Sequence, residues 1–193
     1  MAEKKNQLEA AGEGHVVFSY EESIGYMIGD FVRDKDAITA SLLLTEMTAW
    51  YAAQGMNLLE ALDALYQKHG YHGEKTVNLV MPGLEGMANM KALMAKLRAE
   101  PLSHVAETPV AVRRDYQDGS EVEVSTGALT TMELVGSNVL QYRLADGTDL
   151  FVRPSGTEPK IKVYVLAVGS DQKDCQEKVA KYTAWAESLK EMV

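Results

Sequence analysis

Apolar side chains in the first half of the chain recur at helical intervals, with strand-like runs between them. Three stretches place apolar residues every three or four positions, as amphipathic helices do: residues 37–55, 57–70 and 84–101. Asn57 and Glu60 stand at the spacing of a capping box, which predicts the start of the second helix. The apolar runs 16–18 and 76–80 predict strands, the first of the kind buried in a parallel sheet. We therefore expect an α/β layer with a mostly parallel sheet and helices.

The chain begins with a segment that differs from the helices after it. Residues 2–11 predict a helix rich in Ala, Glu and Lys, with few apolar positions to bury. It leads into a strand that needs parallel neighbours. We expect sequence ahead of this segment in a longer protein, an incomplete sheet with an exposed edge, and hence a tendency to self-associate.

In the second half the pattern changes from helices to strands. Proline at positions 101 and 109 interrupts regular structure and predicts a domain boundary, giving domains 1–102 and 103–193. Alternating apolar and polar residues predict four strands: residues 110–116, 139–144, 148–152 and 161–168. Asp146-Gly147 predicts a hairpin turn, and an apolar stripe over 175–193 predicts a final amphipathic helix. Antiparallel strands with a helix on one face make an α+β domain.

Composition and charge narrow the class of partner. The chain has 193 residues, is 46% hydrophobic and carries a net charge of −9. An acidic chain lacks the basic face that nucleic acid or an anionic membrane requires, so we expect neither as a partner. A single cysteine fits a reducing compartment, and no apolar run approaches the roughly 20 residues of a membrane span. With no apolar signal core at the N-terminus, we expect a cytoplasmic protein.

The segment 153–160, Arg-Pro-Ser-Gly-Thr-Glu-Pro-Lys, carries the clearest candidate chemistry. It lies between two predicted strands, and its two prolines remove donors from any sheet ladder. A guanidinium, two hydroxyls and a flexible glycine within five positions are groups that hold a phosphate. The alternative is an ordinary hairpin loop, which uses the same small and polar residues.

A second polar loop follows the first predicted strand. Glu21, Glu22 and Ser23 place two carboxylates and a hydroxyl at the carboxyl end of that strand, where ligands bind in α/β sheets. A carboxylate can accept hydrogen bonds from two vicinal hydroxyls of a sugar. The alternative is a solvated turn. Lys35 lies in a charged run whose alternative is an exposed helix start.

Other catalytic signals are absent from the sequence. The four histidines form no helical pair and no Cys/His quartet, so we expect no metal site. Cys175 lies on the apolar stripe of the last helix, which indicates an inert thiol. No serine-hydrolase, Walker or dinucleotide-binding motif occurs.

Three segments in the right order resemble the α-D-phosphohexomutase family. They are residues 20–26 (Tyr-Glu-Glu-Ser-Ile-Gly-Tyr), 29–36 (Gly-Asp-Phe-Val-Arg-Asp-Lys-Asp) and 153–160. The likeness runs from about residue 2 to the C-terminus, and it is strongest to bacterial phosphoglucomutases and phosphomannomutases. It implies the C-terminal part of the sugar-binding third domain, followed by the fourth, phosphate-binding domain with a fold similar to the TATA-binding protein.

The resemblance also implies roles for individual residues. The sugar hydroxyls would be bound by Glu21 and Ser23, with Glu22 as a further contributor. Arg153, Ser155, Gly156 and Thr157 would bind the phosphate that is not transferred, with Lys35 close to the phosphate or sugar. The substrate would be a phosphorylated hexose, of glucose or mannose, and the partners would be the N-terminal domains of the same enzyme.

Two parts of the family's machinery have no match here, so no catalytic or metal residue is assigned. Ser41 follows Thr and Ala as in the phosphoserine motif, but Leu42 comes next and the segment reads as a helix. The magnesium loop has no counterpart, since Asp146 begins a hairpin turn. We expect the chain alone to be inactive and to hold no cofactor, whereas the complete enzyme would use Mg²⁺ and a hexose 1,6-bisphosphate activator. The alternative is a stand-alone, non-catalytic phosphosugar-binding module, and the preferred sugar is left open.

Overall fold

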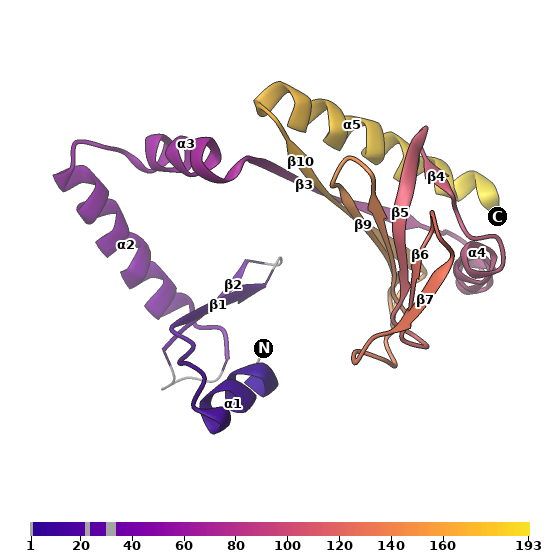
Figure 1. Ribbon diagram of the computed structural model, residues 1–193, viewed down its shortest axis with the longest axis horizontal. Coiled ribbons are helices and arrows are strands. Elements are labelled where there is room, and N and C mark those ends of the chain that lie inside the picture. The colour runs from indigo at the N-terminus through magenta and orange to yellow at the C-terminus, as the bar shows by residue number, and fades with distance from the viewer. Residues whose placement is uncertain (1, 22–23, 30–33) are drawn as a thin grey trace. The chain divides into compact units, whose positions relative to one another are not determined.

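The computed structural model describes residues 2–21, 24–29 and 34–193, with the side chains of residues 2–5 excepted (Figure 1). The chain divides into two compact units, residues 1–65 and 66–193.

The first unit contains helices and a β-hairpin. Its elements are α1 (Ala2–Ala11), β1 (Phe18–Glu21), β2 (Gly25–Ile28), α2 (Ala37–Ala53) and the greater part of α3 (Leu58–His69). β1 and β2 pair antiparallel, from Phe18 opposite Ile28 to Glu21 opposite Gly25. Three residues separate the two strands, and so short a connection permits only antiparallel pairing. The parallel neighbours that the sequence predicts for the first strand are not found within the described residues.

The second unit, which is described throughout, is an α+β domain built on an eight-stranded sheet. The strands are β3 (Tyr71–Val80), β4 (His104–Val105), β5 (Thr108–Asp115), β6 (Ser120–Glu123), β7 (Ala128–Thr131), β8 (Leu140–Leu144), β9 (Asp149–Pro154) and β10 (Lys160–Gly169). The sheet runs in the order β3-β10-β9-β8-β5-β6-β7, with β4 paired to β5, and every pair is antiparallel. The second unit is therefore an antiparallel α+β domain, as the sequence predicts.

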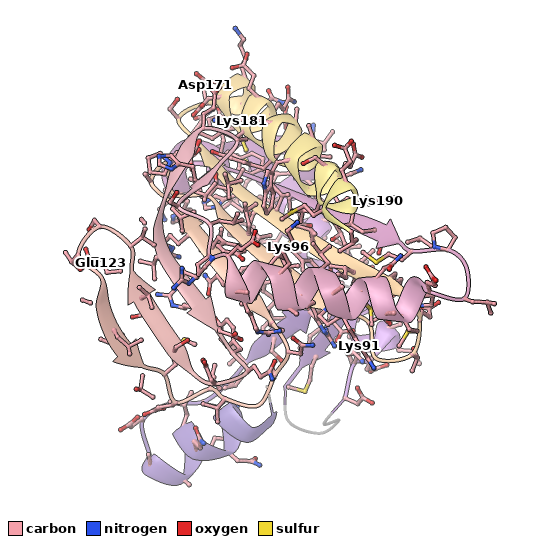
Figure 2. All side chains as sticks on the ribbon, turned by 90° about the vertical axis from the view of Figure 1, so that its right-hand side faces the viewer. Lys91, Lys96, Glu123, Asp171, Lys181 and Lys190 are labelled. Carbon is pink, nitrogen blue, oxygen red and sulfur yellow. The ribbon has the colours of Figure 1, made fainter. Side chains whose placement is uncertain are left out.

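Two helices cover one face of this sheet. α4 (Gly86–Ala99) and α5 (Gln172–Ser188) lie against the same face, and a short 3-10 turn (Leu189–Met192) follows α5 (Figure 2). Alternate residues of β10 point into this layer, and Ile161, Val163 and Val165 are fully buried there. Leu93 and Leu97 of α4 are likewise inaccessible. Burying each such side chain contributes about 1.5–3 kcal/mol relative to leaving it exposed.

The boundary between the units differs from the predicted domain boundary. β3 and α4 fall within the predicted first domain, 1–102, yet they belong to the second unit. All ten residues of β3 pair with β10, and four residues of α4 (Met90, Leu93, Met94 and Leu97) enter the core of the second unit. The division lies after Leu65, because these long-range contacts outweigh the break that the prolines mark.

None of the helices in the described residues is long and apolar enough to span a bilayer.

Candidate functional site

The predicted phosphate loop joins β9 to β10, and β10 lies beside the edge strand β3. Arg153 pairs with Lys162 across the two strands, so their side chains lie on the same face of the sheet. The N–H of Ser155 donates to the carbonyl of Lys160 (2.9 Å), which closes the loop. The N–H of Met81, just after β3, donates to the carbonyl of Pro159 (2.9 Å). A third strand therefore anchors the loop, which fixes its position relative to the sheet.

The loop surrounds a cavity of about 280 Å³. The cavity is lined by Arg153, Pro154, Ser155, Gly156, Thr157, Glu158, Lys160 and Lys162. Four of the five residues expected at the phosphate are in this wall, namely Arg153, Ser155, Gly156 and Thr157, whereas Lys35 lies in the first unit.

Donors in the loop are free to bind an anion. The Ser155 hydroxyl oxygen accepts from the N–H groups of Thr157 and Glu158 at 3.4 and 3.3 Å, which are long hydrogen bonds. Its own proton remains available to a ligand. The N–H of Gly156 has no acceptor in the described part of the chain. Gly156 also has open space where a side chain would begin, so a ligand can approach its backbone.

Positive charge dominates the cavity although the whole chain is acidic. Three cations, Arg153, Lys160 and Lys162, face one carboxylate, Glu158. Lys160 forms an ion pair with Glu158. Its hydrogen bond and charge, with a smaller contribution from Lys162, hold the pKa of Glu158 below its usual value. Arg153 and Lys162 have no acidic partner among the residues described, so the cavity keeps two uncompensated positive charges.

Lys162 was missed at the sequence level, although a signal for it exists. Positions 160 and 162 alternate with buried residues of β10, so their side chains share the face that carries Arg153. Counting that two-residue period from the loop would have added Lys162 to the candidate residues.

The predicted sugar site lies in the first unit, around the β1–β2 hairpin. Lys35 Nζ lies 3.4 Å from Glu21 Oε1, so the structure brings these two candidate residues together. Gly25, opposite Glu21, sits beneath the pair: a side chain there would meet Glu21 Oε1 and Lys35 Cδ at 2.5 Å. A side chain at this position would displace both partners, so glycine lets the ion pair lie directly over the hairpin. Glu22 and Ser23 lie outside the described residues.

Two other candidate nucleophiles, Ser41 and Cys175, have structural surroundings. Ser41 donates to the carbonyl of Ala37 within α2 (2.7 Å), as a helical serine does. Cys175 is a buried residue of α5 that faces the sheet, and burial raises the pKa of its thiol. Among the described residues no three His, Cys, Asp or Glu side chains gather as metal ligands would.

Both loops lie in segments that match models of known proteins. Residues 4–69 match the family model described as phosphoglucomutase/phosphomannomutase, alpha/beta/alpha domain III. Residues 77–181 match the model of the C-terminal domain of the same proteins, and this second match alone covers more than half of the chain. The chain belongs to the phosphoglucomutase/phosphomannomutase family.

Individual relatives agree with this assignment. The chain is 35% identical over 149 residues to a phosphoglucomutase of Staphylococcus haemolyticus, covering 77% of the chain and 27% of that protein. It is 30% identical over 165 residues to one of Staphylococcus aureus, covering 86% of the chain and 30% of that protein. The chain thus spans less than a third of the length of these relatives.

A solved structure shows the same fold. This structure is the open form of the Paramecium phosphoglucomutase pp63/parafusin. The alignment covers 97% of this chain and 32% of the Paramecium chain, with a TM-score of 0.60 and 17% sequence identity. The α/β and α+β assignments therefore agree with a known phosphoglucomutase fold.

Proposed function

We propose that this chain recognises the sugar and phosphate of a phosphohexose, as the C-terminal part of an enzyme that interconverts hexose 1-phosphate and hexose 6-phosphate. The observation that carries the proposal is the cavity at the β9–β10 loop, where Arg153 and Lys162 have no acidic partner in the described chain. Unpaired cations beside free loop donors favour a dianion as the ligand.

Each loop residue has a distinct part in holding the phosphate. The planar guanidinium of Arg153 can donate to two phosphate oxygens at once. The hydroxyls of Ser155 and Thr157 and the N–H of Gly156 can donate to the others. Lys162 adds the second positive charge that a dianion requires. These contacts position the substrate, and they leave the opposite end of the sugar free for reaction.

The Glu21–Lys35 pair is proposed to bind the sugar. Glu21 accepts from sugar hydroxyls, with Glu22 and Ser23 as further contributors, and Lys35 orients the Glu21 carboxylate. Lys35 is about half exposed, so it can also reach a ligand oxygen.

Phosphoryl transfer itself requires groups that these residues do not supply. In the complete enzyme Mg²⁺ would neutralise charge on the transferred phosphoryl group, with hexose 1,6-bisphosphate as activator. The described residues contain no acidic cluster that fits the ion. This chain therefore positions its substrate without activating it, and we expect it to be inactive by itself.

Titration calorimetry tests the proposal. We expect glucose 1-phosphate and glucose 6-phosphate to bind weakly and glucose not to bind. Because Arg153 makes charged hydrogen bonds, Arg153→Ala should weaken binding by roughly 10- to 100-fold.

Arg143→Ala is the matched control. Arg143 is an exposed arginine of the same sheet, paired with Asp149 and outside the cavity, so its loss should leave affinity unchanged. Equal binding by wild type and Arg153→Ala, or equal binding of glucose and its phosphates, would exclude the loop as the phosphate site.

A further inference from the structure

The phosphate cavity contains a negative charge that an anion site does not need for binding. Glu158 lies in its wall together with Arg153, Lys160 and Lys162. A carboxylate repels a bound phosphate dianion, so it lowers the affinity that the three cations provide. The presence of Glu158 therefore requires an explanation other than tight binding.

The side chain of Glu158 contributes little to holding the loop together. It is 60% exposed, and Lys160 is its ion-pair partner among the described residues. Backbone groups close the loop instead. The carbonyl of Glu158 accepts from the N–H of Lys160 (2.7 Å), and the carbonyl of Lys160 accepts from the N–H of Ser155 (2.9 Å). The carboxylate can therefore be replaced without opening the loop.

Lys160 is placed to serve either Glu158 or a ligand. It is the first residue of β10 and lies in the cavity wall. Its main chain is fixed by the loop hydrogen bonds and by pairing with Val80 of β3, so only its side chain can turn. An exposed ion pair contributes only about 0–1 kcal/mol, so the Lys160 ammonium can leave Glu158 at little cost.

The charges in the cavity show what the ion pair achieves. With Glu158 paired to Lys160, Arg153 and Lys162 leave two positive charges, which match a phosphate dianion. Without Glu158 the cations would outweigh the ligand and hold it longer, because affinity differences between related complexes lie mostly in the dissociation rate. The proposed reaction requires one cavity to hold the phosphate of a hexose 1-phosphate or of a hexose 6-phosphate, and to release both.

We propose that Glu158 competes with the bound phosphate for Lys160 and thereby limits the affinity of the phosphate site. In the free protein Glu158 holds the Lys160 ammonium, and on binding this ammonium turns to a phosphate oxygen. The inference rests on the proposed function, since it concerns the same cavity. Arg153 supplies affinity for the phosphate, whereas Glu158 keeps the ligand exchangeable.

Glu158→Gln should strengthen binding. It frees Lys160 and removes a like charge from beside the ligand, so calorimetry should show affinity for glucose 1-phosphate raised roughly 3- to 10-fold. Glu177→Gln is the matched control. Glu177 is an exposed carboxylate of α5 that pairs with Lys173 (3.7 Å) outside the cavity, so its loss should leave the affinity unchanged.

A lysine variant shows whether Glu158 acts through Lys160. Lys160→Met keeps a side chain of similar length and removes its charge, so it should weaken binding roughly 3- to 10-fold. In that background Glu158→Gln should have a clearly smaller effect on affinity, because only direct repulsion of the ligand is left to remove. An effect of equal size in both backgrounds would contradict competition for Lys160.

The pH dependence of sulfate binding separates this role from a structural one. Inorganic sulfate keeps both charges from about pH 7 to about pH 4, the range in which a glutamate begins to titrate. Lys160 holds the pKa of Glu158 below its usual value in the free protein, whereas a bound anion raises it. Sulfate affinity should therefore increase as the pH falls, and less so in Glu158→Gln. The cations of the wall stay charged, and β3 places uncharged Val80 and Asn78 opposite Lys160 and Lys162.

Two further results would overturn the proposal: glucose 1-phosphate bound no more tightly by Glu158→Gln than by wild type, or sulfate affinity that rises equally in both as the pH falls. Arg153→Ala in the same titrations separates the two proposals. If Arg153→Ala weakens binding and Glu158→Gln leaves it unchanged, the phosphate site stands and the competition does not. If neither variant changes binding, or no phosphate binds, both proposals fail.

Discussion

Arg153 and Lys162 are direct cross-strand partners with like charge, an arrangement that destabilises a sheet in the absence of a ligand. The proposed phosphate site would account for it, since a bound dianion would supply the missing negative charge. At the residue scale the sequence showed the loop's hydroxyls and guanidinium. The two-residue period could have placed Lys162 on the face of the loop, but its position directly opposite Arg153 depends on strand register.

Replacing Lys162 should separate stability from binding. Lys162→Thr removes the repulsion, so the free energy of unfolding should rise by about 0.5 kcal/mol at low salt. The gain should shrink in 0.5 M salt because salt screens the repulsion, with about a 4–5 Å Debye length. Affinity for glucose 1-phosphate should fall. Urea titration and calorimetry would measure both, and lower stability together with unchanged affinity would refute the argument.

Two buried tyrosines should control stability at alkaline pH. Burial raises the pKa of Tyr142 to about 12, and burial together with a hydrogen bond to Asp146 raises that of Tyr182 to about 12. Since a raised pKa favours the protonated phenol in the folded state, this stability is complete below the usual pKa of 10. It should be lost as pH rises from 10 to 12.

Tyr142→Phe should increase stability. The Tyr142 hydroxyl is buried and has no hydrogen-bond partner among the residues that the structure describes. Its removal should therefore raise the free energy of unfolding by about 1 kcal/mol and reduce the loss of stability at alkaline pH. Tyr182→Phe is the contrast. Its hydroxyl donates to Asp146 (2.6 Å) and contacts Thr108 (2.8 Å), so that variant should be less stable at pH 7. Urea titrations at pH 7 and 11 test both, and equal changes in the two variants would contradict the assignment.

At the scale of elements, local signals predicted helices and turns well. The Asn57–Glu60 capping box is confirmed: the N–H of Asn57 donates to Glu60 (2.8 Å), and Asn57 Oδ1 accepts from Leu59 and Glu60. The partner of β3 was not predictable in the same way. Its pairing with β10 joins segments far apart in the sequence, and no local pattern specifies that choice.

Gly86, at the start of α4, should be needed to keep the phosphate loop in its position. A side chain there would meet the Met81 carbonyl oxygen at 2.1 Å and Pro159 Cβ at 3.0 Å. Gly86→Ala should therefore destabilise the protein by about 1–3 kcal/mol and weaken phosphate binding by shifting the loop.

Ala92→Gly is the control in the same helix. Ala92 is exposed, so glycine there should lower stability by about 1 kcal/mol without changing affinity. Thermal denaturation and calorimetry distinguish the two variants. Equal affinity in Gly86→Ala and wild type would show that the loop does not depend on this contact.

For the whole molecule, the sequence predicted the order of an α/β part and an α+β part. The compact units divide after Leu65, earlier than the predicted boundary after residue 102, because local breaks do not record which elements share a core. The core lies in the second unit, whereas Met27 and Ala61 are the only buried apolar residues described in residues 1–65. The two units should therefore differ in stability.

The two units should unfold at different urea concentrations. In Trp50→Phe, fluorescence reports on Trp185, which packs against the core of the second unit. Far-UV circular dichroism also includes α2 and α3, so its signal should begin to fall at lower urea than the fluorescence. Coincident curves would show one cooperative structure instead.

Backbone and side-chain NMR of the ¹⁵N-labelled chain during a glucose 1-phosphate titration tests the central claim most directly. The account predicts that the amides of Ser155, Gly156 and Thr157 and the Nε–H of Arg153 shift together and saturate, while glucose leaves them in place. Saturable shifts elsewhere with these four resonances unmoved would contradict it.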